Sequence, residues 1–370
     1  MVDEIQAKSL LRKSKRIDSW FVSRYGMNLY RGCPHACAYC DGRAERYHVE
    51  GDFGRDVAIK TNAPELLARE LDPRRKRKPL ERAYIFLGGG VGDSYARPEL
   101  EHRIARRCLE VIAGHPFPVH VLTKSPLVER DLDLLLRIDE GQRAIVSVSL
   151  STVDDRLAAR LEPGCASPTE RLSMLARVKE AGLATGIYLM PVLPGLSDSE
   201  EDIDRALTRA VEAGVDFVIF GGLTLKPGRQ MDHYLDVVCA LDADLAERTA
   251  SLYSGDRWGH ADGAYYEELD RRFARLARRR RVPRRIPPRL FVDILDDNDR
   301  AVVLLEHMDY FQRSEGRDSF FGLAARSIAR LDRPLGELRD DLCSLSGVGE
   351  FTARLLLEIL DTGRCGHYDT

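Results

Sequence analysis

The chain has 370 residues, of which 44% are hydrophobic and 31% are charged, and its formal net charge is −3. This length allows two domains, since about 100 to 200 residues per domain is usual. The composition excludes a polycation, and no apolar run approaches the ~20 residues that cross a bilayer. The N-terminus lacks the order of a secretory signal, and eight cysteines in such a chain do not make a disulfide scaffold. We therefore expect a cytoplasmic protein with no membrane partner.

Three cysteines, Cys33, Cys37 and Cys40, stand together in the segment CPHACAYC. One tight loop with this spacing can present three thiolates to a single centre. An iron–sulfur cubane takes four ligands, so three cysteines leave one iron open for a substrate or cofactor. A zinc site is one alternative, but zinc sites are usually built from two separated pairs of ligands and no second pair exists here. Three buried structural cysteines are the other alternative.

Between residues 24 and 222, short β-branched runs alternate with longer amphipathic stretches, which predicts strand–helix units and a parallel sheet. After the cysteine segment, strands are predicted at residues 83–87, 119–122, 144–150, 185–190 and 216–220. Apolar spacing predicts helices at residues 99–113, 168–181 and 199–213, the last with capping and acidic residues at its start. The pattern indicates an α/β fold, a complete or partial βα barrel with its site at the carboxyl ends of the strands.

Glycine and polar residues follow consecutive predicted strands, where such a site would lie. They are Gly88, Gly89, Gly90, Lys124, Ser149 and Ser151. Glycines let a ligand approach the backbone closely, and a lysine can hold a carboxylate as a point charge. Each residue alone is typical of a tight turn, a surface lysine or a strand-end serine. Their common location indicates one binding site.

Basic residues gather in two blocks. Residues 271–290 hold ten arginines and no acidic residue, and residues 74–78 read RRKRK. Such blocks can neutralise nucleic-acid phosphates and release counterions. A solvated helix face followed by a linker is an equally weighted alternative. Pro283, Pro287 and Pro288 indicate a linker or a rigid crossing between domains.

The remainder of the chain, residues 296–367, is predicted to form four or five short helices. Near its end, Gly347, Val348 and Gly349 allow a hairpin between two helices. Backbone N–H groups at a helix N-terminus can hold a phosphate oxygen. The alternative is a helical bundle in which the same residues form an ordinary interhelical turn.

The cysteine spacing, with Tyr39 before the last cysteine, resembles the signature of the radical S-adenosylmethionine (SAM) superfamily. Residues 28–32, 88–93, 122–125 and 220–226 are similar to the branch related to spore photoproduct lyase, the DNA-repair photolyase-like group, and the resemblance covers roughly residues 20–310. It implies a partial (β/α)6 TIM-type barrel and a 4Fe–4S cluster on Cys33, Cys37 and Cys40. It also implies reductive cleavage of SAM to a 5′-deoxyadenosyl radical, with an external electron donor such as flavodoxin or ferredoxin.

Within this resemblance, the residues at the strand ends receive roles in binding SAM. The turn of Gly88, Gly89 and Gly90 corresponds to the site of the SAM amino group. Lys124 is expected to hold the carboxylate of SAM. The hydroxyls of Ser149 and Ser151 are expected at the ribose, and Tyr39 at the adenine.

The C-terminal region resembles a helix-hairpin-helix motif, within a domain similar to the small lyase domain of X-family DNA polymerases. The Schiff-base lysine of that domain has no counterpart, because no lysine lies between residues 290 and 370. Without an amine nucleophile, that lyase reaction is not expected. We expect a DNA clamp instead, with Gly347, Val348, Gly349 and Thr352 as its binding residues.

The chain departs from spore photoproduct lyase in one respect. That enzyme returns a hydrogen atom from a cysteine after its second strand, whereas residues 88–95 contain no thiol here. Cys165 and Tyr95 are the candidate hydrogen donors, and the catalytic residue stays unassigned. The expected function is a radical SAM enzyme acting on DNA, such as a photoproduct-lyase-like carbon–carbon lyase. A radical SAM enzyme acting on RNA or protein, and a non-catalytic iron–sulfur nucleic-acid-binding protein, are the alternatives.

The expected domain organisation has four parts. An N-terminal extension covers residues 1–19, and the barrel covers residues 20–255. An Arg/Pro-rich connecting segment follows at residues 256–295. The helical domain covers residues 296–370.

Overall fold

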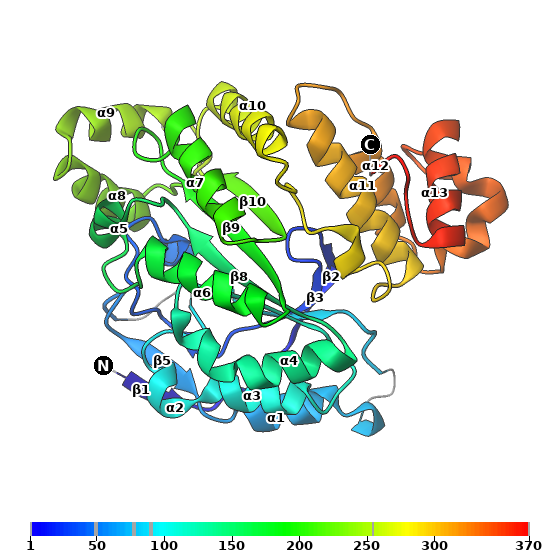
Figure 1. Cartoon of the computed structure of the whole chain (residues 1–370), viewed down its shortest axis with the longest axis horizontal. Helices are drawn as coiled ribbons and strands as arrows, with labels where there is room; N and C mark the ends of the chain where they lie inside the picture. Colours follow the sequence, from blue (N-terminus) through cyan, green and yellow to red (C-terminus); the bar gives the residue numbers. More distant parts are fainter. Residues whose placement is uncertain (1, 48–50, 76–78, 89–91, 254, 369–370) are drawn as a thin grey trace.

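The computed structural model describes residues 2–47, 51–75, 79–88, 92–253 and 255–368, so Gly89, Gly90 and the basic residues 76–78 lie outside the described residues. Its main body is a seven-stranded sheet in the order β10-β9-β8-β7-β6-β3-β2 (Figure 1). The strands from β3 to β10 are parallel, and β2 pairs antiparallel with β3 at one edge. Their bounds are β2 (Arg12–Asp18), β3 (Ser23–Met27), β6 (Tyr84–Leu87), β7 (Val119–Thr123), β8 (Ala144–Leu150), β9 (Ala184–Val192) and β10 (Phe217–Gly222).

The predicted α/β fold is confirmed, because this curled sheet is the partial barrel that the strand–helix pattern indicates. Each strand expected after the cysteine segment is present within two residues of its predicted bounds. A second, three-stranded sheet has the order β1-β5-β4. Its strands are β1 (Val2–Ile5), β4 (Tyr30–Arg31) and β5 (Val57–Lys60).

Aromatic side chains fill the inside of the half barrel. The ring of Phe86 lies 4.2 Å from that of Phe21 and 5.4 Å from that of His120, and Phe21 stacks on Tyr188 at 5.1 Å. Large buried rings dominate the energetics of such cores. Burial lowers the pKa of His120 to about 4, and its Nε2 lies 2.9 Å from the Ser147 hydroxyl. These rings form an uncharged cluster, and a cavity of ≈ 310 Å³ lined by Phe21, Phe86 and Lys60 lies beside it.

Helices cover the outer face of the sheet (Figure 1). The predicted helices 168–181 and 199–213 are confirmed as α6 and α7, and the side chain of Ser199 caps α7 by accepting a bond from Asp202 N–H at 3.1 Å. None of the described helices is long and apolar enough to cross a membrane. The bounds are α1 (Ala63–Leu71), α2 (Glu99–His102), α3 (Ile104–Ile112), α4 (Leu132–Gly141), α5 (Asp155–Leu161), α6 (Pro168–Glu180), α7 (Glu200–Glu212), α8 (Arg229–Cys239), α9 (Ala243–Leu252) and α10 (Gly263–Arg280).

The single helix predicted at residues 99–113 is interrupted, because Arg103 adopts a left-handed conformation between α2 and α3. The cause is the buried carboxylate of Glu99. It accepts hydrogen bonds from the backbone N–H groups of Ala105, at 2.9 Å, and Arg106, at 3.3 Å. A side-chain acceptor therefore caps a new helix start where apolar spacing alone predicts continuation.

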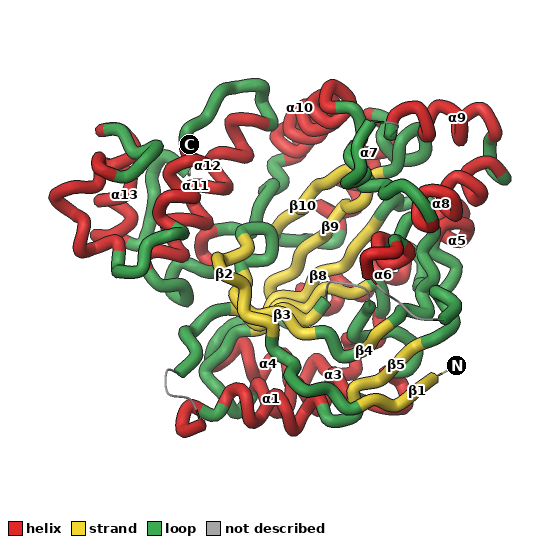
Figure 2. Tube along the Cα trace, turned by 180° about the vertical axis from the view of Figure 1, so that it is seen from behind, coloured by secondary structure: helices red, strands yellow, loops and turns green. Residues whose placement is uncertain are grey.

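The C-terminal helices dock at the β2 edge of the sheet, as Figure 2 shows from behind. They are α11 (Asp297–Arg313), α12 (Phe321–Ile328) and α13 (Glu350–Thr362), with a 3₁₀ segment, η6 (Leu335–Ser344). Arg24 of β3 pairs with Asp299 of α11, and His307 Nε2 donates to the carbonyl oxygen of Ser19 at 2.9 Å. The helical region is thus joined to the barrel by buried polar contacts.

The segment expected to connect the two domains contains α10, which packs on the other edge strand. Phe273 of α10 stacks on Phe220 of β10 with ring centroids 4.1 Å apart. After the helix, the carbonyl oxygen of Pro283 accepts a bond from Val218 N–H at 2.9 Å. The domain boundaries at residues 255 and 295 stay predictions.

Candidate active site

The cysteine loop, residues 32–40, is held in one tight conformation. Gly32 has a φ of +83°, and a Cβ atom there would lie 2.3 Å from a backbone oxygen of the adjacent segment, so only glycine fits. Ala36 also has a positive φ, at 54°. Arg43 holds the turn, since its guanidinium donates to the carbonyl oxygens of Ala36, at 2.9 Å, and Cys37, at 3.0 Å.

The three thiols of the loop differ in their electrostatic surroundings. Burial raises the pKa of Cys33 and raises that of Cys40 to about 12. The pKa of Cys37 is lowered to about 7, first by a hydrogen bond with Cys165, whose Sγ lies 3.8 Å away. The positive charge of Lys124 lowers it further, against the effect of burial. Cys37 is therefore the thiol of the loop that ionises most readily.

The three thiols of the loop are the ligands that an iron–sulfur cluster would need. Among the residues that the structure describes, no group of three or more His, Cys, Asp or Glu side chains is close enough together to hold a metal ion. Besides burial and Asp93, the charges of Cys37 and Cys40 raise the pKa of Cys33, so the three thiols lie within electrostatic reach of one another. Metal binding draws thiols together and removes their protons. The donor set fits a cluster on these three cysteines.

Next to the loop, four side chains from separate segments converge on the buried carboxylate of Glu162. The Nζ of Lys124 lies 3.0 Å from Glu162 Oε1, and the Ser151 hydroxyl donates to the same oxygen at 2.8 Å. The hydroxyl of Tyr39 and the guanidinium of Arg171 also donate to this carboxylate. We call these five residues the Glu162 site. It joins the ends of β7 and β8 to the cysteine loop.

The charges of the Glu162 site do not balance. The side chains of Glu162 and Arg171 are each 1% exposed, and that of Lys124 is 13% exposed. Burial alone would raise the pKa of Glu162, but the charges of Lys124 and Arg171 lower it, so the carboxylate is ionised. Lys124 keeps its proton in turn, because Glu162 raises its pKa against the effect of burial. Two cations therefore face the single carboxylate of the site, and Lys124 also lies within electrostatic reach of the Cys37 thiol.

Ser149, the second strand-end serine, contributes through its backbone. Its carbonyl oxygen accepts bonds from Arg171 Nη1, at 2.7 Å, and Lys124 Nζ, at 3.4 Å. Its hydroxyl donates to the carbonyl oxygen of Met190 at 3.0 Å. Of the two serines expected at the ribose, Ser151 points its hydroxyl at the Glu162 site and Ser149 turns its hydroxyl toward β9.

Asp93 ties the cysteine loop to the strand ends. Its carboxylate lies 3.0 Å from His35 Nε2 of the loop and accepts the backbone N–H of Lys124 at 2.7 Å. The other ring nitrogen of His35 donates to the carbonyl oxygen of Gly164 at 2.9 Å. Despite burial, Asp93 raises the pKa of His35, and both ring nitrogens face acceptors. Asp93 therefore positions the loop against the end of β7.

Of the glycine turn after β6, the structure describes only the first residue, Gly88. Gly88 has a φ of +134°, and a Cβ atom would lie 2.3 Å from the carbonyl oxygen of Leu122. This close approach of two backbones requires glycine. Gly89 and Gly90, expected at the SAM amino group, lie outside the described residues, and their role stays a prediction.

The two candidate hydrogen donors lie in different surroundings. Cys165 is beside Cys37, as described above, and therefore next to the cysteine loop. Tyr95 is completely buried, and burial together with the charges of Asp131 and Glu99 raises its pKa. Only Cys165 shares the neighbourhood of the Glu162 site. The role of either residue stays a prediction.

The C-terminal hairpin has a conformation that requires its first glycine. Gly347 has a φ of +83°, and a Cβ atom would lie 2.7 Å from the backbone nitrogen of Ala324. Gly349 is the N-cap residue of α13, while Val348 and Thr352 are buried. These four residues line a cavity of ≈ 590 Å³ whose other walls include the exposed rings of Phe320 and Phe351. The expected DNA-binding residues thus lie together, and their contact with DNA stays a prediction.

Many arginines of the 271–290 block pair within the fold. Arg275 forms two bonds of 2.8 Å with Glu200, and Arg280 pairs with Asp204, both on α7. Arg289 pairs with Asp216. These pairs favour the structural alternative for the side of α10 that faces the barrel. In the other basic block, Arg74 and Arg75 pair with Asp72.

The sequence reasoning missed Glu162, Arg171 and Asp93. Glu162 and Arg171 carry no local signature, because one ends a short helix and the other lies inside an amphipathic helix. Asp93 lies three residues after Gly90, and its place near a strand end could have identified it.

Comparisons with known proteins agree on one family and one fold. The Radical SAM superfamily model matches residues 27–207. An uncharacterized protein of Mycobacterium tuberculosis is 31% identical over 283 residues, which cover 75% of this chain and 81% of that protein. One of Methanocaldococcus jannaschii is 28% identical over 58% of this chain and 76% of its own length. The structure of spore photoproduct lyase complexed with dinucleoside spore photoproduct has a similar fold, with a TM-score of 0.57 and 16% identity over 75% of this chain and 79% of that one.

Proposed function

Because this chain belongs to the radical SAM superfamily, we propose that it holds a 4Fe–4S cluster on Cys33, Cys37 and Cys40, binds SAM at the Glu162 site and acts on DNA. The observation that carries this proposal is that side chains from separate segments converge on the carboxylate of Glu162. Tyr39, Lys124 and Ser151 come from three different segments, and all contact one buried carboxylate beside the cysteine loop. When bound, the cluster and SAM together supply abstraction of a hydrogen atom from the substrate.

The two cations of the Glu162 site support a carboxylate-bearing ligand. Lys124 and Arg171 together face the single anion Glu162, and Lys124 is the more exposed of the two cations. Its ammonium can turn from Glu162 toward the carboxylate of SAM while Arg171 stays paired. The hydroxyls of Ser151 and Tyr39 are donors that can bond the ribose or the edge of the adenine.

The chain's own residues also control where the cysteine loop lies. Asp93 accepts from both His35 and the backbone of Lys124, so the loop and the cation of the Glu162 site share one support. A shared support keeps the distance between the two sites constant.

Two observations support DNA as the substrate. The fold is similar to that of spore photoproduct lyase, which was solved with a dinucleoside spore photoproduct. In addition, Gly347 and Gly349 place backbone N–H groups at the start of α13, where a helix N-terminus attracts phosphate. The exact reaction stays open to lesion reversal or modification, because residues 88–95 offer no thiol.

The proposal is tested with anaerobically reconstituted protein, SAM, a reductant and ultraviolet-irradiated DNA, followed by a mass-resolved search for altered nucleosides. The expected result is a DNA product that requires SAM and is lost in Cys37→Ala. Salt-dependent retention on duplex DNA is measured in parallel. A protein that cleaves SAM yet neither binds nor alters DNA would overturn the DNA part of the proposal and leave the radical SAM part intact.

A further inference from the structure

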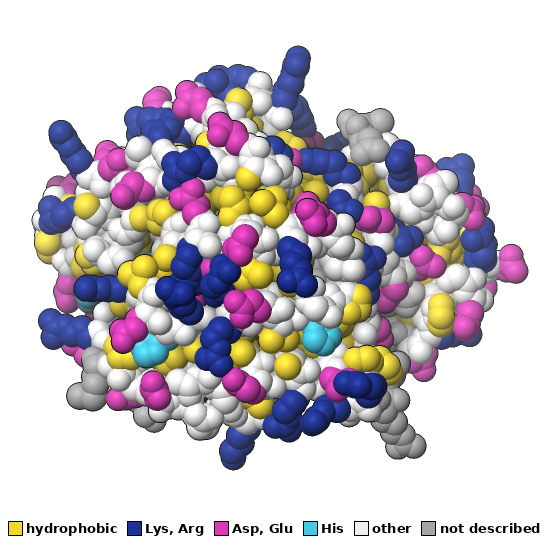
Figure 3. Space-filling model, turned by 60° about the horizontal axis from the view of Figure 1, so that its bottom comes forward, with side chains coloured by type: hydrophobic (Ala, Val, Ile, Leu, Met, Phe, Trp, Pro, Cys, Tyr) yellow, Lys and Arg dark blue, Asp and Glu magenta, His cyan; other side chains and the backbone are white. Residues whose placement is uncertain are grey.

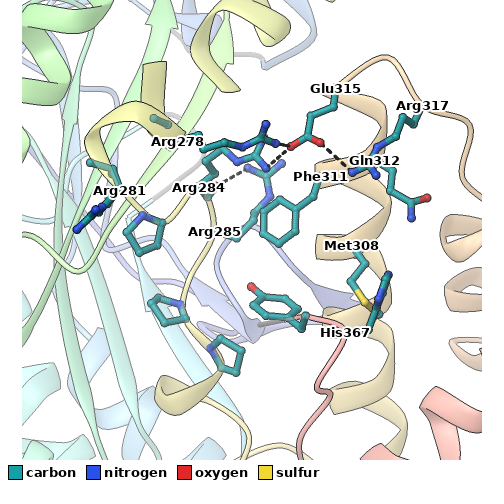
Figure 4. Close-up of a pocket in the computed structure, with 16 residues that line it drawn as sticks. Arg278, Arg281, Arg284, Arg285, Met308, Phe311, Gln312, Glu315, Arg317 and His367 are labelled. Carbon is teal, nitrogen blue, oxygen red and sulfur yellow. Dashed lines mark hydrogen bonds and ion pairs between the residues drawn. The ribbon is translucent and has the colours of Figure 1, made fainter. Parts of the chain in front are cut away.

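A cavity of ≈ 690 Å³ lies between the end of α10, the proline-rich segment after it and α11 (Figure 4). We call it the α10–α11 groove. Among its described lining residues, five are arginines and Glu315 is the single carboxylate. The arginines are Arg278, Arg281, Arg284, Arg285 and Arg317.

One of these arginines is committed to the fold. Arg285 is 4% exposed and lies over the ring of Tyr310, with its guanidinium carbon 3.3 Å from the ring centroid. It also lies over Trp20 at 4.8 Å and donates to the carbonyl oxygen of Arg284 at 3.0 Å. Burial lowers its pKa. Arg285 therefore forms a wall of the groove.

Three other arginines share one acid. Arg284 Nη2 lies 2.9 Å from Glu315 Oε1, Arg317 Nη2 lies 2.8 Å from Oε2, and Arg278 also pairs with Oε1. Burial alone would raise the pKa of Glu315, but Arg278 and Arg284 lower it, so the carboxylate is charged. One negative charge cannot neutralise three guanidinium groups. An excess of positive charge remains at this wall.

Arg281 adds a further cation. It ends α10 with a φ of 55°, its side chain is exposed, and it has no ion-pair partner among the described residues. In Figure 4, Arg281 and Arg317 lie on opposite sides of the cavity. Cations therefore face the groove from both sides.

The basic surface continues beyond the groove. A second cavity, of ≈ 680 Å³, shares Arg278, Glu315 and Arg317 and extends along α10, where Arg271 pairs with Glu268 and Arg275 pairs with Glu200. Elsewhere the surface is mixed, since Figure 3 shows a face on which basic and acidic side chains are interspersed. Two adjoining cavities that are rich in arginine fit an extended polyanion better than a single phosphate ion.

We propose that the α10–α11 groove binds the phosphate backbone of DNA, with Arg281, Arg284 and Arg317 contacting phosphates. This inference rests on the proposed action on DNA. Guanidinium groups suit phosphate oxygens because their planar fork donates two parallel hydrogen bonds. Glu315 competes with phosphate for these arginines, since its carboxylate accepts hydrogen bonds that the guanidinium groups would otherwise donate to phosphate oxygens.

The test compares the salt dependence of DNA affinity, measured by fluorescence anisotropy with a short labelled duplex. The groove variant is Arg281→Asn with Arg317→Gln, because both side chains are exposed and asparagine tolerates the left-handed conformation. The matched control is Arg137→Gln with Arg177→Gln, which removes two exposed charges on α4 and α6. Glu315→Gln is the opposite change, and free nucleotide and inorganic phosphate serve as competitors.

The groove variant is expected to lower the slope of log affinity against log salt by about two, since each phosphate contact contributes about 0.9. Glu315→Gln should raise the affinity for DNA, and the control should change neither the affinity nor the slope. Free nucleotide and inorganic phosphate should compete only weakly. If wild-type protein binds DNA and the groove variant keeps the wild-type slope of log affinity against log salt, the groove is not the DNA-binding surface. The proposed function stands in that case. Strong competition by free nucleotide would assign the groove to a small ligand and also overturn it. A wild type that binds no DNA overturns both the groove and the proposed action on DNA.

Discussion

The Glu162 site and the α10–α11 groove both gather cations around one glutamate, but they differ in burial. In the Glu162 site, Glu162 and Arg171 are each 1% exposed, and hydroxyl donors complete the coordination. In the groove, Glu315 is 18% exposed, and its partners Arg278 and Arg317 are 67% and 62% exposed. A buried pair is costly to break, whereas exposed pairs contribute little to stability and exchange partners readily. The same charge pattern thus builds a rigid site in one place and an open binding surface in the other.

The largest effect is expected for Glu162→Gln, which leaves Lys124 and Arg171 buried without their anion. The free energy of unfolding should fall by about 3–5 kcal/mol, the usual cost of removing one partner of a buried pair. The matched change in the groove, Glu315→Gln, should cost about 1 kcal/mol. Urea denaturation of wild type, Glu162→Gln and Glu315→Gln measures both losses in the free energy of unfolding. Equal losses for the two variants would contradict the contrast between the sites.

A smaller effect is expected for Asp93→Asn, which weakens the support of the cysteine loop. The buried carboxylate loses charge-assisted bonds to His35 and to the backbone of Lys124, at a cost of about 1–3 kcal/mol. Iron and sulfide per chain should fall after anaerobic reconstitution, because the loop is no longer held in place. Asp52→Asn, which changes a carboxylate that is 60% exposed, is the control. A destabilised Asp93→Asn protein with full iron content would show that Asp93 does not position the loop.

The hairpin offers a change that separates DNA binding from SAM chemistry. Gly347→Ala places a Cβ atom 2.7 Å from a backbone nitrogen and forces a left-handed conformation, which costs roughly 1–2 kcal/mol for a residue other than glycine. DNA affinity should fall severalfold while SAM cleavage is unchanged. Gly336→Ala is the matched control, since nothing lies within 4 Å of its Cβ position. Loss of SAM cleavage in Gly347→Ala, with Gly336→Ala normal, would argue against separate roles.

The smallest effect concerns the ion pairs between α7 and α10. Arg280 and Arg279 hold the pKa of Asp204 at about 2, below its usual 3.8. A depressed acid pKa stabilises the folded state above about pH 4 and loses this contribution as pH falls toward 2. Asp204→Asn should therefore lower the free energy of unfolding by about 0.2–1 kcal/mol at neutral pH. The difference from wild type should shrink as pH falls through this range, and a difference independent of pH would show that packing is responsible.

The sequence carries most of the fold because strands follow local β-branched runs, as at residues 144–150. The rule that sites lie at strand ends also identifies Lys124 and Ser151. This rule does not identify Glu162, because Glu162 follows a helix and its contact with Tyr39 joins residues 123 positions apart. The arginines of α10 show the same limit. Their acidic partners, such as Glu200 and Glu315, lie far along the chain, so the sequence alone cannot separate structural arginines from those left for a ligand.

The most direct test of the central claim is anaerobic detection of 5′-deoxyadenosine from reconstituted protein supplied with SAM and dithionite. If the cysteine loop and the Glu162 site form one radical SAM centre, wild-type protein should release 5′-deoxyadenosine. Cys37→Ala should release none, and Lys124→Gln should require more SAM for the same rate. Wild-type protein that binds iron and sulfide but releases no 5′-deoxyadenosine would contradict the account.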